Sequence, residues 1–146
     1  MYSCRQDSLR LPGNMTASCA SKPTLRERPL LSLDQADRAE AVFGILASGT
    51  RIRMLHEMVR REEICVVDLA AALSMKPQAV SNQLARLLDQ GVVASRRAGN
   101  NVLYRVADPC VPILLDRALC LIEEVAKRGV ASLELSPVLA SEGSSS

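Results

Sequence analysis

The middle of the chain carries apolar residues three and four positions apart, as on one face of an α-helix. Ser32, followed three residues later by Gln35, forms a capping-box pattern and predicts a helix that runs to about Ala47 and is ended by Ser48-Gly49. Thr50 is predicted to cap a second helix. Four apolar residues of this helix are expected to face inward (Ile52, Leu55, Met58, Val59), and four arginines to point elsewhere (Arg51, Arg53, Arg60, Arg61).

Two further helices are predicted on either side of a three-residue turn. The segment VVDLAAAL at 66–73 indicates a short helix, and Ser74-Met75-Lys76 indicates the turn. Pro77 suits the first position of the next helix, because its missing N–H would be unpaired there in any case. We expect this helix to run from 77 to about 90 and to end at Gly91, with four residues inward (Val80, Leu84, Leu87, Leu88).

After Gly91 the spacing of apolar residues changes from helical to alternating. Residues 92–97 and 102–106, joined by the turn AGNN at 98–101, predict a β-hairpin with one buried face. Asp108-Pro109 then begins a last helix that reaches about Arg128, where Gly129 ends it. The apolar residues of this helix cover more than one stripe, which favours a partner, and a two-fold dimer is the simplest one.

The two ends of the chain lack this periodicity. Residues 1–31 are expected to form a flexible N-terminal arm, residues 32–130 the folded domain and residues 131–146 a C-terminal tail. No apolar stretch is long enough to span a membrane, and Arg and Asp stand where a signal peptide needs an apolar core. We therefore expect a cytoplasmic protein without a membrane partner.

Composition excludes several classes of function. Aromatic residues make up only 2% of the 146 residues, so stacking of nucleic-acid bases on aromatic platforms is excluded. The net charge of +2 is too small to identify a polyanionic partner by itself. With one His, no pairing of a nucleophile with a base and no Gly-rich phosphate loop, the chain is not expected to be an enzyme. Five Cys without an export signal argue against a disulfide framework.

A short helix, a tight turn, a helix that begins with Pro and a hairpin follow one another in the order of a winged helix-turn-helix. This fold is mainly α, with about five helices and a small β-hairpin as its wing. The second helix of the pair enters the major groove of DNA, and polar side chains on its outer face read it. The candidates on this helix are Gln78, Ala79, Ser81, Asn82, Gln83 and Arg86; those on the hairpin are Arg96, Arg97, Asn100 and Asn101, for phosphate or minor-groove contacts.

These segments resemble the ArsR/SmtB family of bacterial metal-responsive repressors. The resemblance rests on VSNQLARLLDQGVV, with its Gly stop, and on the pattern R-x-G-x-x-V-L-Y-R-V, and it covers roughly residues 33–128. The family often has His where this chain has Gln83, and both side chains are polar. The resemblance implies a homodimer whose interface comprises the first and last helices. It also implies a repressor that leaves its operator DNA when an inducer binds.

The cysteines suggest which inducer the family resemblance implies. EEICVVDLA resembles the ELCVCDLA box of the arsenic- and cadmium/lead-sensing branch, with Cys65 at its first Cys and Val67 at its second. In cadmium/lead-sensing members, Cys from the partner's N-terminal arm complete the site, and this chain has Cys4 and Cys19 there. The arm is long enough, since about 14 extended residues span roughly 45 Å. The resulting hypothesis is a three-thiolate site, formed by Cys4 and Cys19 of one subunit and Cys65 of the other, for Cd(II), Pb(II), Zn(II) or As(III), and no organic cofactor.

Cys110 and Cys120 in the last helix are second candidates for metal ligands. Asp108 and Glu124 imitate part of the zinc pattern that the family carries on this helix, but Leu121 stands where a His belongs. Ordinary buried or interface cysteines remain an alternative for Cys65, Cys110 and Cys120, as do plain arm residues for Cys4 and Cys19. A different class of sensor also remains open, a dithiol switch that responds to oxidant or persulfide through a cysteine pair.

Overall fold

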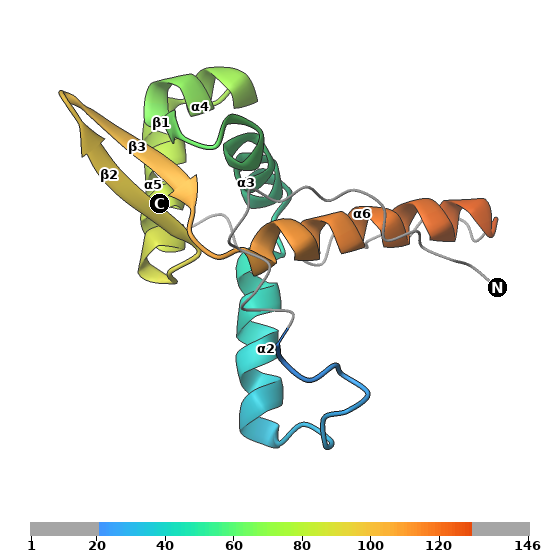
Figure 1. Cartoon of the computed structure of the whole chain (residues 1–146). Helices are drawn as coiled ribbons and strands as arrows, with labels where there is room; N and C mark the ends of the chain where they lie inside the picture. The colour runs from blue at the N-terminus through green and yellow to red at the C-terminus, as the bar shows by residue number, and fades with distance from the viewer. Residues whose placement is uncertain (1–20, 130–146) are drawn as a thin grey trace, which may run out of the picture. The chain divides into compact units, whose positions relative to one another are not determined.

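Five helices and a three-stranded sheet make up residues 21–129, the part of the chain that the computed structural model describes (Figure 1). The helices and strands confirm the predicted order of a winged helix-turn-helix. Within the described residues, the chain divides into two units with the boundary between Ile113 and Leu114, inside the last helix. The predicted tail at 131–146 and most of the predicted arm lie outside the described residues.

The first two helices begin at serine caps. Helix α2 (Leu33–Leu46) has the predicted capping box, in which Ser32 and Gln35 each bond the other's backbone N–H at 3.2 and 3.0 Å. Helix α3 (Gly49–Arg61) is capped by Ser48, so the prediction that Thr50 caps it was wrong. Ser48 is in the extended conformation of a cap residue, and its hydroxyl accepts from the N–H of Arg51.

The buried face of α3 differs from the predicted one. Met54, Leu55 and Met58 are fully buried, whereas Ile52 and Val59 are exposed. Arg51, predicted to point elsewhere, lies three and four residues before Met54 and Leu55, hence on the buried face, and is half-buried. The pattern of apolar residues was misread by about a quarter turn, because Ile52 and Val59 flank the stripe that Met54 and Leu55 occupy.

Helices α4 (Val66–Leu73) and α5 (Pro77–Asp89) form the helix-turn-helix. Ser74 closes α4 in the left-handed conformation, with φ 54° and ψ 43°, and Pro77 is the first residue of α5 as predicted. The facing sides of the two helices are apolar and bury six residues: Leu69, Ala70, Leu73, Val80, Leu84 and Leu87. Leu88, predicted inward, is half-buried. This packing fixes the angle at which α5 is presented.

Replacing Leu84 by Ala tests that packing. Leu84 is 1% exposed, so its truncation leaves a cavity and is expected to lower the free energy of unfolding by about 2–5 kcal/mol. Leu88→Ala, at a half-exposed position of the same helix, is the control and should cost clearly less. Urea denaturation followed by far-ultraviolet circular dichroism measures both. Equal losses would show that the α4–α5 contact is not part of the core.

The predicted hairpin is one part of a larger sheet. Strands β2 (Val93–Ala98) and β3 (Asn101–Val106) pair antiparallel, and Gly99, at φ 63°, supplies the left-handed residue of their two-residue turn. A third strand, β1 (Ile64–Cys65), pairs with the other edge of β3, giving the order β1-β3-β2. The sequence analysis missed β1, because two residues are too short to show an alternating pattern.

Helix α6 (Cys110–Lys127) begins where Asp108 Oδ1 accepts a 2.7 Å bond from the N–H of Cys110. Its end agrees with the prediction, since Gly129 has φ 66°. The side chains of Leu119, Leu121 and Ile122 are more than half exposed. Within residues 21–129, none of the helices combines the length and apolar character needed to cross a bilayer.

Candidate nucleic-acid interface

Helix α5 presents a row of polar side chains on the side opposite to its buried stripe. Gln78, Asn82 and Arg86 are four residues apart and exposed, so they lie in line along the helix. The Nε2 amide of Gln78 donates to Asn82 Oδ1 at 3.0 Å, which orders the two amides side by side. Ala79 and Ser81 flank the row and are half-buried. This row has the amides and the guanidinium that bind base edges and phosphates in a major groove.

Gln83, the remaining polar candidate on α5, lies toward the protein interior. It is half-buried, and its Oε1 accepts a 3.4 Å bond from Nη1 of Arg51 in α3. The structure thus engages this side chain with a neighbouring helix. A base contact from Gln83 stays a prediction.

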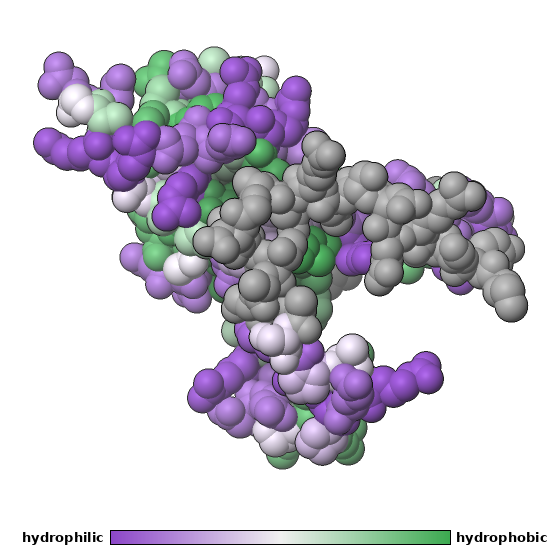
Figure 2. Space-filling view, in the orientation of Figure 1, coloured by the Kyte–Doolittle hydropathy of each residue, from purple (hydrophilic) through white to green (hydrophobic). Residues whose placement is uncertain are grey.

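The β2–β3 hairpin carries the second group of candidates. Asn100 lies in its turn, Asn101 begins β3 opposite Ala98, and Arg97 lies opposite Val102. Arg97, Asn100 and Asn101 are all exposed. Figure 2 shows hydrophilic side chains over this hairpin. The hairpin can therefore offer one cation and two amides to a phosphate backbone.

Arg96 forms an ion pair that the sequence analysis did not predict. Its Nε donates to Oε1 of Glu63 at 2.7 Å, and its Nη2 bonds Oε2 of the same carboxylate. The two side chains reach one another across β3, because Glu63 precedes β1 and Arg96 lies in β2. The hydrogen bond from Arg96 holds the pKa of Glu63 below its usual 4.5 and raises the pKa of Arg96. DNA phosphate would have to compete with Glu63 for this guanidinium.

A Glu63→Gln variant is expected to lose a pH-dependent stabilisation. Because the pKa of Glu63 is lowered in the folded chain, the ion pair stabilises the fold fully above the ordinary pKa of 4.5, and this stabilisation is lost as the pH falls from there through the lowered pKa of the folded state. At pH 7 the melting temperature should therefore drop by a few degrees at most, since exposed ion pairs contribute little. At a pH low enough to protonate Glu63 in the folded chain, wild type and variant should melt together. A difference that persists there would exclude the carboxylate charge as its cause.

Two of the arginines predicted to point away from the core, Arg60 and Arg61, bind the carboxylate of Glu57. Glu57 is buried near the end of α3, and it accepts from Nη1 of Arg60 at 2.7 Å and from Nε of Arg61 at 3.0 Å. The hydrogen bond from Arg61 lowers the pKa of Glu57. Arg60 and Arg61 are exposed, as predicted, but their charge is directed at Glu57.

The described cysteines lie in two places. Cys65 is half-buried, pairs with Leu103 in the sheet and is the residue just before α4. Cys110 begins α6 and is exposed, and Cys120 is half-buried further along that helix. Cys4 and Cys19 lie outside the described residues. Between residues 21 and 129, no three His, Cys, Asp or Glu side chains are grouped closely enough to hold a metal ion.

Three residues of interest were missed in the sequence. Lys76 is the exposed N-cap residue of α5. Its position directly before Pro77, the first residue of that helix, was the sequence signal that could have identified it as a candidate for DNA contact. Glu63 and Arg51 gave no such signal, because their partners Arg96 and Gln83 are more than thirty residues away along the chain.

The α4–turn–α5 unit and the β2–β3 hairpin together define a winged helix-turn-helix protein. Residues 48–95 match the family model described as "Bacterial regulatory protein, arsR family". The HTH-type transcriptional regulator NmtR of Mycobacterium tuberculosis is 37% identical over 95 residues, which are 64% of this chain and 79% of NmtR. The chain therefore belongs to the ArsR family of bacterial regulatory proteins.

Two further comparisons concern repressors. A transcriptional repressor SmtB homolog from Synechocystis is 44% identical over 79 residues, which span 54% of this chain but only 59% of that protein. Among solved structures, the AntR antimony-specific transcriptional repressor has 49% identity and a TM-score of 0.64, covering 75% of this chain and 98% of that one. These relatives are regulators of transcription, in agreement with the expectation that the chain is not an enzyme.

Proposed function

We propose that this protein is a homodimeric, cytoplasmic repressor that binds operator DNA and leaves it when its cysteines bind a thiophilic ion. The observation that carries the proposal is the exposed row Gln78–Asn82–Arg86 on α5, beside a wing with Arg97, Asn100 and Asn101, in a member of the ArsR family. The amides suit adenine edges, and the arginines suit guanine or phosphate. Lys76, at the start of α5, adds a phosphate contact.

Exposed apolar side chains support the dimer. Leu33, Val42 and Phe43 on α2 are exposed, as are Leu119, Leu121 and Ile122 on α6. Large exposed apolar side chains on two helices need cover from water, and a second copy of the chain provides it symmetrically. In such a dimer, two α5 helices can be presented about one DNA turn apart.

The proposed inducer is a soft ion that prefers sulfur, such as Sb(III), As(III), Cd(II), Pb(II) or Zn(II). The similarity to an antimony-specific repressor and the half-buried thiol of Cys65 support this class. Cys4 and Cys19 are proposed to complete the site with Cys65. Coupling free energies of about 1–3 kcal/mol between two sites weaken binding roughly 5- to 150-fold, which suffices for release.

Helix geometry limits what Cys110 and Cys120 can do. Ten residues of helix rise about 15 Å, so the two cysteines of one α6 cannot share an ion or form a disulfide with each other. They could serve as a site only together with cysteines of a partner chain. This argues against a dithiol switch within α6 of a single protomer and leaves the pair as the second candidate for ion binding.

The experiment is a titration of the purified chain under anaerobic, reducing conditions. A labelled duplex that the protein enriches from a random library reports DNA binding by anisotropy, while ultraviolet absorption reports thiolate–metal bonds. Sb(III), As(III), Cd(II), Pb(II) and Zn(II) are added separately. Release together with a charge-transfer band is expected for at least one of them. Release only after addition of an oxidant would favour the redox alternative, and no enriched duplex would refute DNA binding.

Deleting residues 1–20 should weaken affinity for the releasing ion while the domain stays folded. The deletion removes Cys4 and Cys19 and leaves in place the helix caps and core residues described within residues 21–129. Losing two of three thiolates is expected to lower affinity at least about tenfold. Competition with a chelator measures this affinity, and a Cys4→Ser/Cys19→Ser chain of full length is the matched control. Unaltered affinity in both would exclude the arm from the site.

A further inference from the structure

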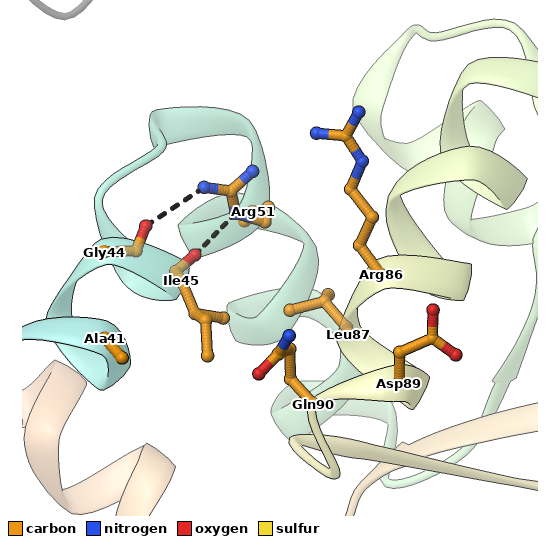
Figure 3. A pocket seen from close by; sticks show the side chains of 8 residues that line it. All are labelled: Ala41, Gly44, Ile45, Arg51, Arg86, Leu87, Asp89 and Gln90. Atoms are coloured by element: carbon orange, nitrogen blue, oxygen red, sulfur yellow. Dashed lines mark hydrogen bonds between the residues drawn. The ribbon is translucent and has the colours of Figure 1, made fainter. Parts of the chain in front are cut away.

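One arginine joins three helices at the point where α2 ends and α3 begins. Arg51 donates from Nε to the carbonyl oxygen of Ile45 and from Nη2 to that of Gly44, the latter at 3.2 Å (Figure 3). Its remaining terminal nitrogen, Nη1, donates to Oε1 of Gln83 in α5 at 3.4 Å. The same guanidinium therefore binds the end of α2 and the middle of the helix that carries the candidate DNA contacts.

The bonds from Arg51 to Gly44 and Ile45 supply hydrogen-bond donors to carbonyl groups in the last turn of α2. The last four carbonyl groups of an α-helix have no partner within the helix, and a guanidinium can satisfy several of them at once. A lysine offers a single nitrogen, so it cannot bind the end of α2 and the side chain of Gln83 in the same planar arrangement. The chemistry of this junction thus needs arginine and not simply a positive charge.

Apolar packing holds α2 only weakly at the same place. Leu46 is its one buried residue within the described part of the chain. A cavity of about 390 Å³ lies where α2 ends, between Ala41, Gly44 and Ile45 on one side and Arg86, Leu87 and Gln90 of the α5 end on the other (Figure 3). Beside this open space, the bonds of Arg51 connect the end of α2 to α3 and α5.

We propose that Arg51 is a positioning residue, which links the placement of α2 to the placement of the DNA-contacting helix α5 through Gln83. The inference rests on the proposed function in two respects, that α5 contacts DNA and that α2 belongs to the dimer interface. A shift of α2 changes the geometry at the carbonyls of Gly44 and Ile45. The guanidinium then passes that change to Gln83 in α5.

The first test reads the link between helices without DNA. Hydrogen exchange of backbone amides, followed by NMR in the full chain, is compared between wild type and Gln83→Leu. The substituted side chain lies in α5, yet amides in the last turn of α2 should exchange several-fold faster, because Arg51 loses one of its three anchors. Arg53→Lys, at an exposed position of α3, is the control and should change nothing there. Unaltered exchange at the end of α2 in Gln83→Leu would overturn the inference.

The second test uses the duplex enriched from a random library and a scrambled duplex of equal length. Arg51→Lys and Gln83→Leu should each lower affinity for the enriched duplex about tenfold, the value of one charged hydrogen bond. The double variant should lose no more than the larger single loss, because both substitutions break one link. The salt dependence of binding should stay as in wild type, since Arg51 is not on a phosphate.

Additive losses in the double variant would overturn the inference, and so would a salt slope lowered by about one, the sign of a lost phosphate contact. A wild-type chain that enriches no duplex would refute the proposed function instead, and the exchange measurement would then decide about Arg51 by itself. Thermal melting of each variant shows whether it folds. Gln83→Leu leaves the bonds at the end of α2 in place, so it keeps the test valid if Arg51→Lys does not fold.

Discussion

Replacing Asn82 and Arg86 together by alanine is expected to lower affinity for the enriched duplex roughly 100-fold or more. Each side chain is exposed on α5, one an amide that can bond adenine bidentately and the other a guanidinium for guanine or phosphate. Each such contact is worth about 1–3 kcal/mol. Since neither side chain belongs to the core, the melting temperature should hardly change. Fluorescence anisotropy at two salt concentrations measures the effect.

The single variants separate the two roles. If Asn82 reads a base, Asn82→Ala lowers affinity for the enriched duplex and spares the scrambled one. If Arg86 binds a phosphate, Arg86→Ala weakens both and lowers the salt slope by about one. Gln90→Ala, exposed just beyond α5, is the control on the same surface. Wild-type affinity in the double variant would mean that another face of the protein meets DNA.

Cys65→Ser is expected to abolish release by the thiophilic ion while DNA affinity stays near that of wild type. The substitution replaces a sulfur by a harder oxygen of similar size, so the site loses a ligand and the sheet keeps its shape. Cys65 is half-buried and its backbone pairs with Leu103, which Ser can do equally well. The measurement is the concentration of ion that releases half of the bound duplex.

Cys110→Ser and Cys120→Ser are the comparison variants, because both keep Cys65. They should respond to the ion as wild type does. The opposite result, a normal response in Cys65→Ser and none in the α6 variants, would move the site to α6. It would also imply that a partner chain completes it, given the separation of Cys110 and Cys120 along one helix.

Several elements determined by local sequence were predicted correctly, although the cap of α3 was placed at Thr50 instead of Ser48. The capping box of Ser32 and Gln35, Pro77 at the start of α5 and Gly99 in the hairpin turn are each dictated by residues within a few positions of one another. The order of these elements was enough to predict the winged helix-turn-helix. The family could be recognised on the same residues.

Features that join distant segments were not predicted. Strand β1 exists only because β3 offers it an unpaired edge, and no pattern within Ile64–Cys65 shows this. Arg51 was predicted only to point away from the core and Arg96 to contact DNA; neither hydrogen bond was predicted, since the acceptors Gln83 and Glu63 stand far away in the sequence. The exposed row on α5 followed from helical spacing alone, whereas knowing which polar side chains are already engaged required the fold.

The short ladder between β1 and β3 has a mechanical consequence. Cys65 is paired to Leu103 by backbone and is followed immediately by α4, so the strand of the wing and the first helix of the DNA-binding pair meet at one residue. A displacement of Cys65 therefore acts directly on both strand β3 and helix α4, with no side chains in between. If Cys65 binds the inducing ion as proposed, the ion would therefore act directly on the wing and on α4, without side chains that relay its effect from a distance.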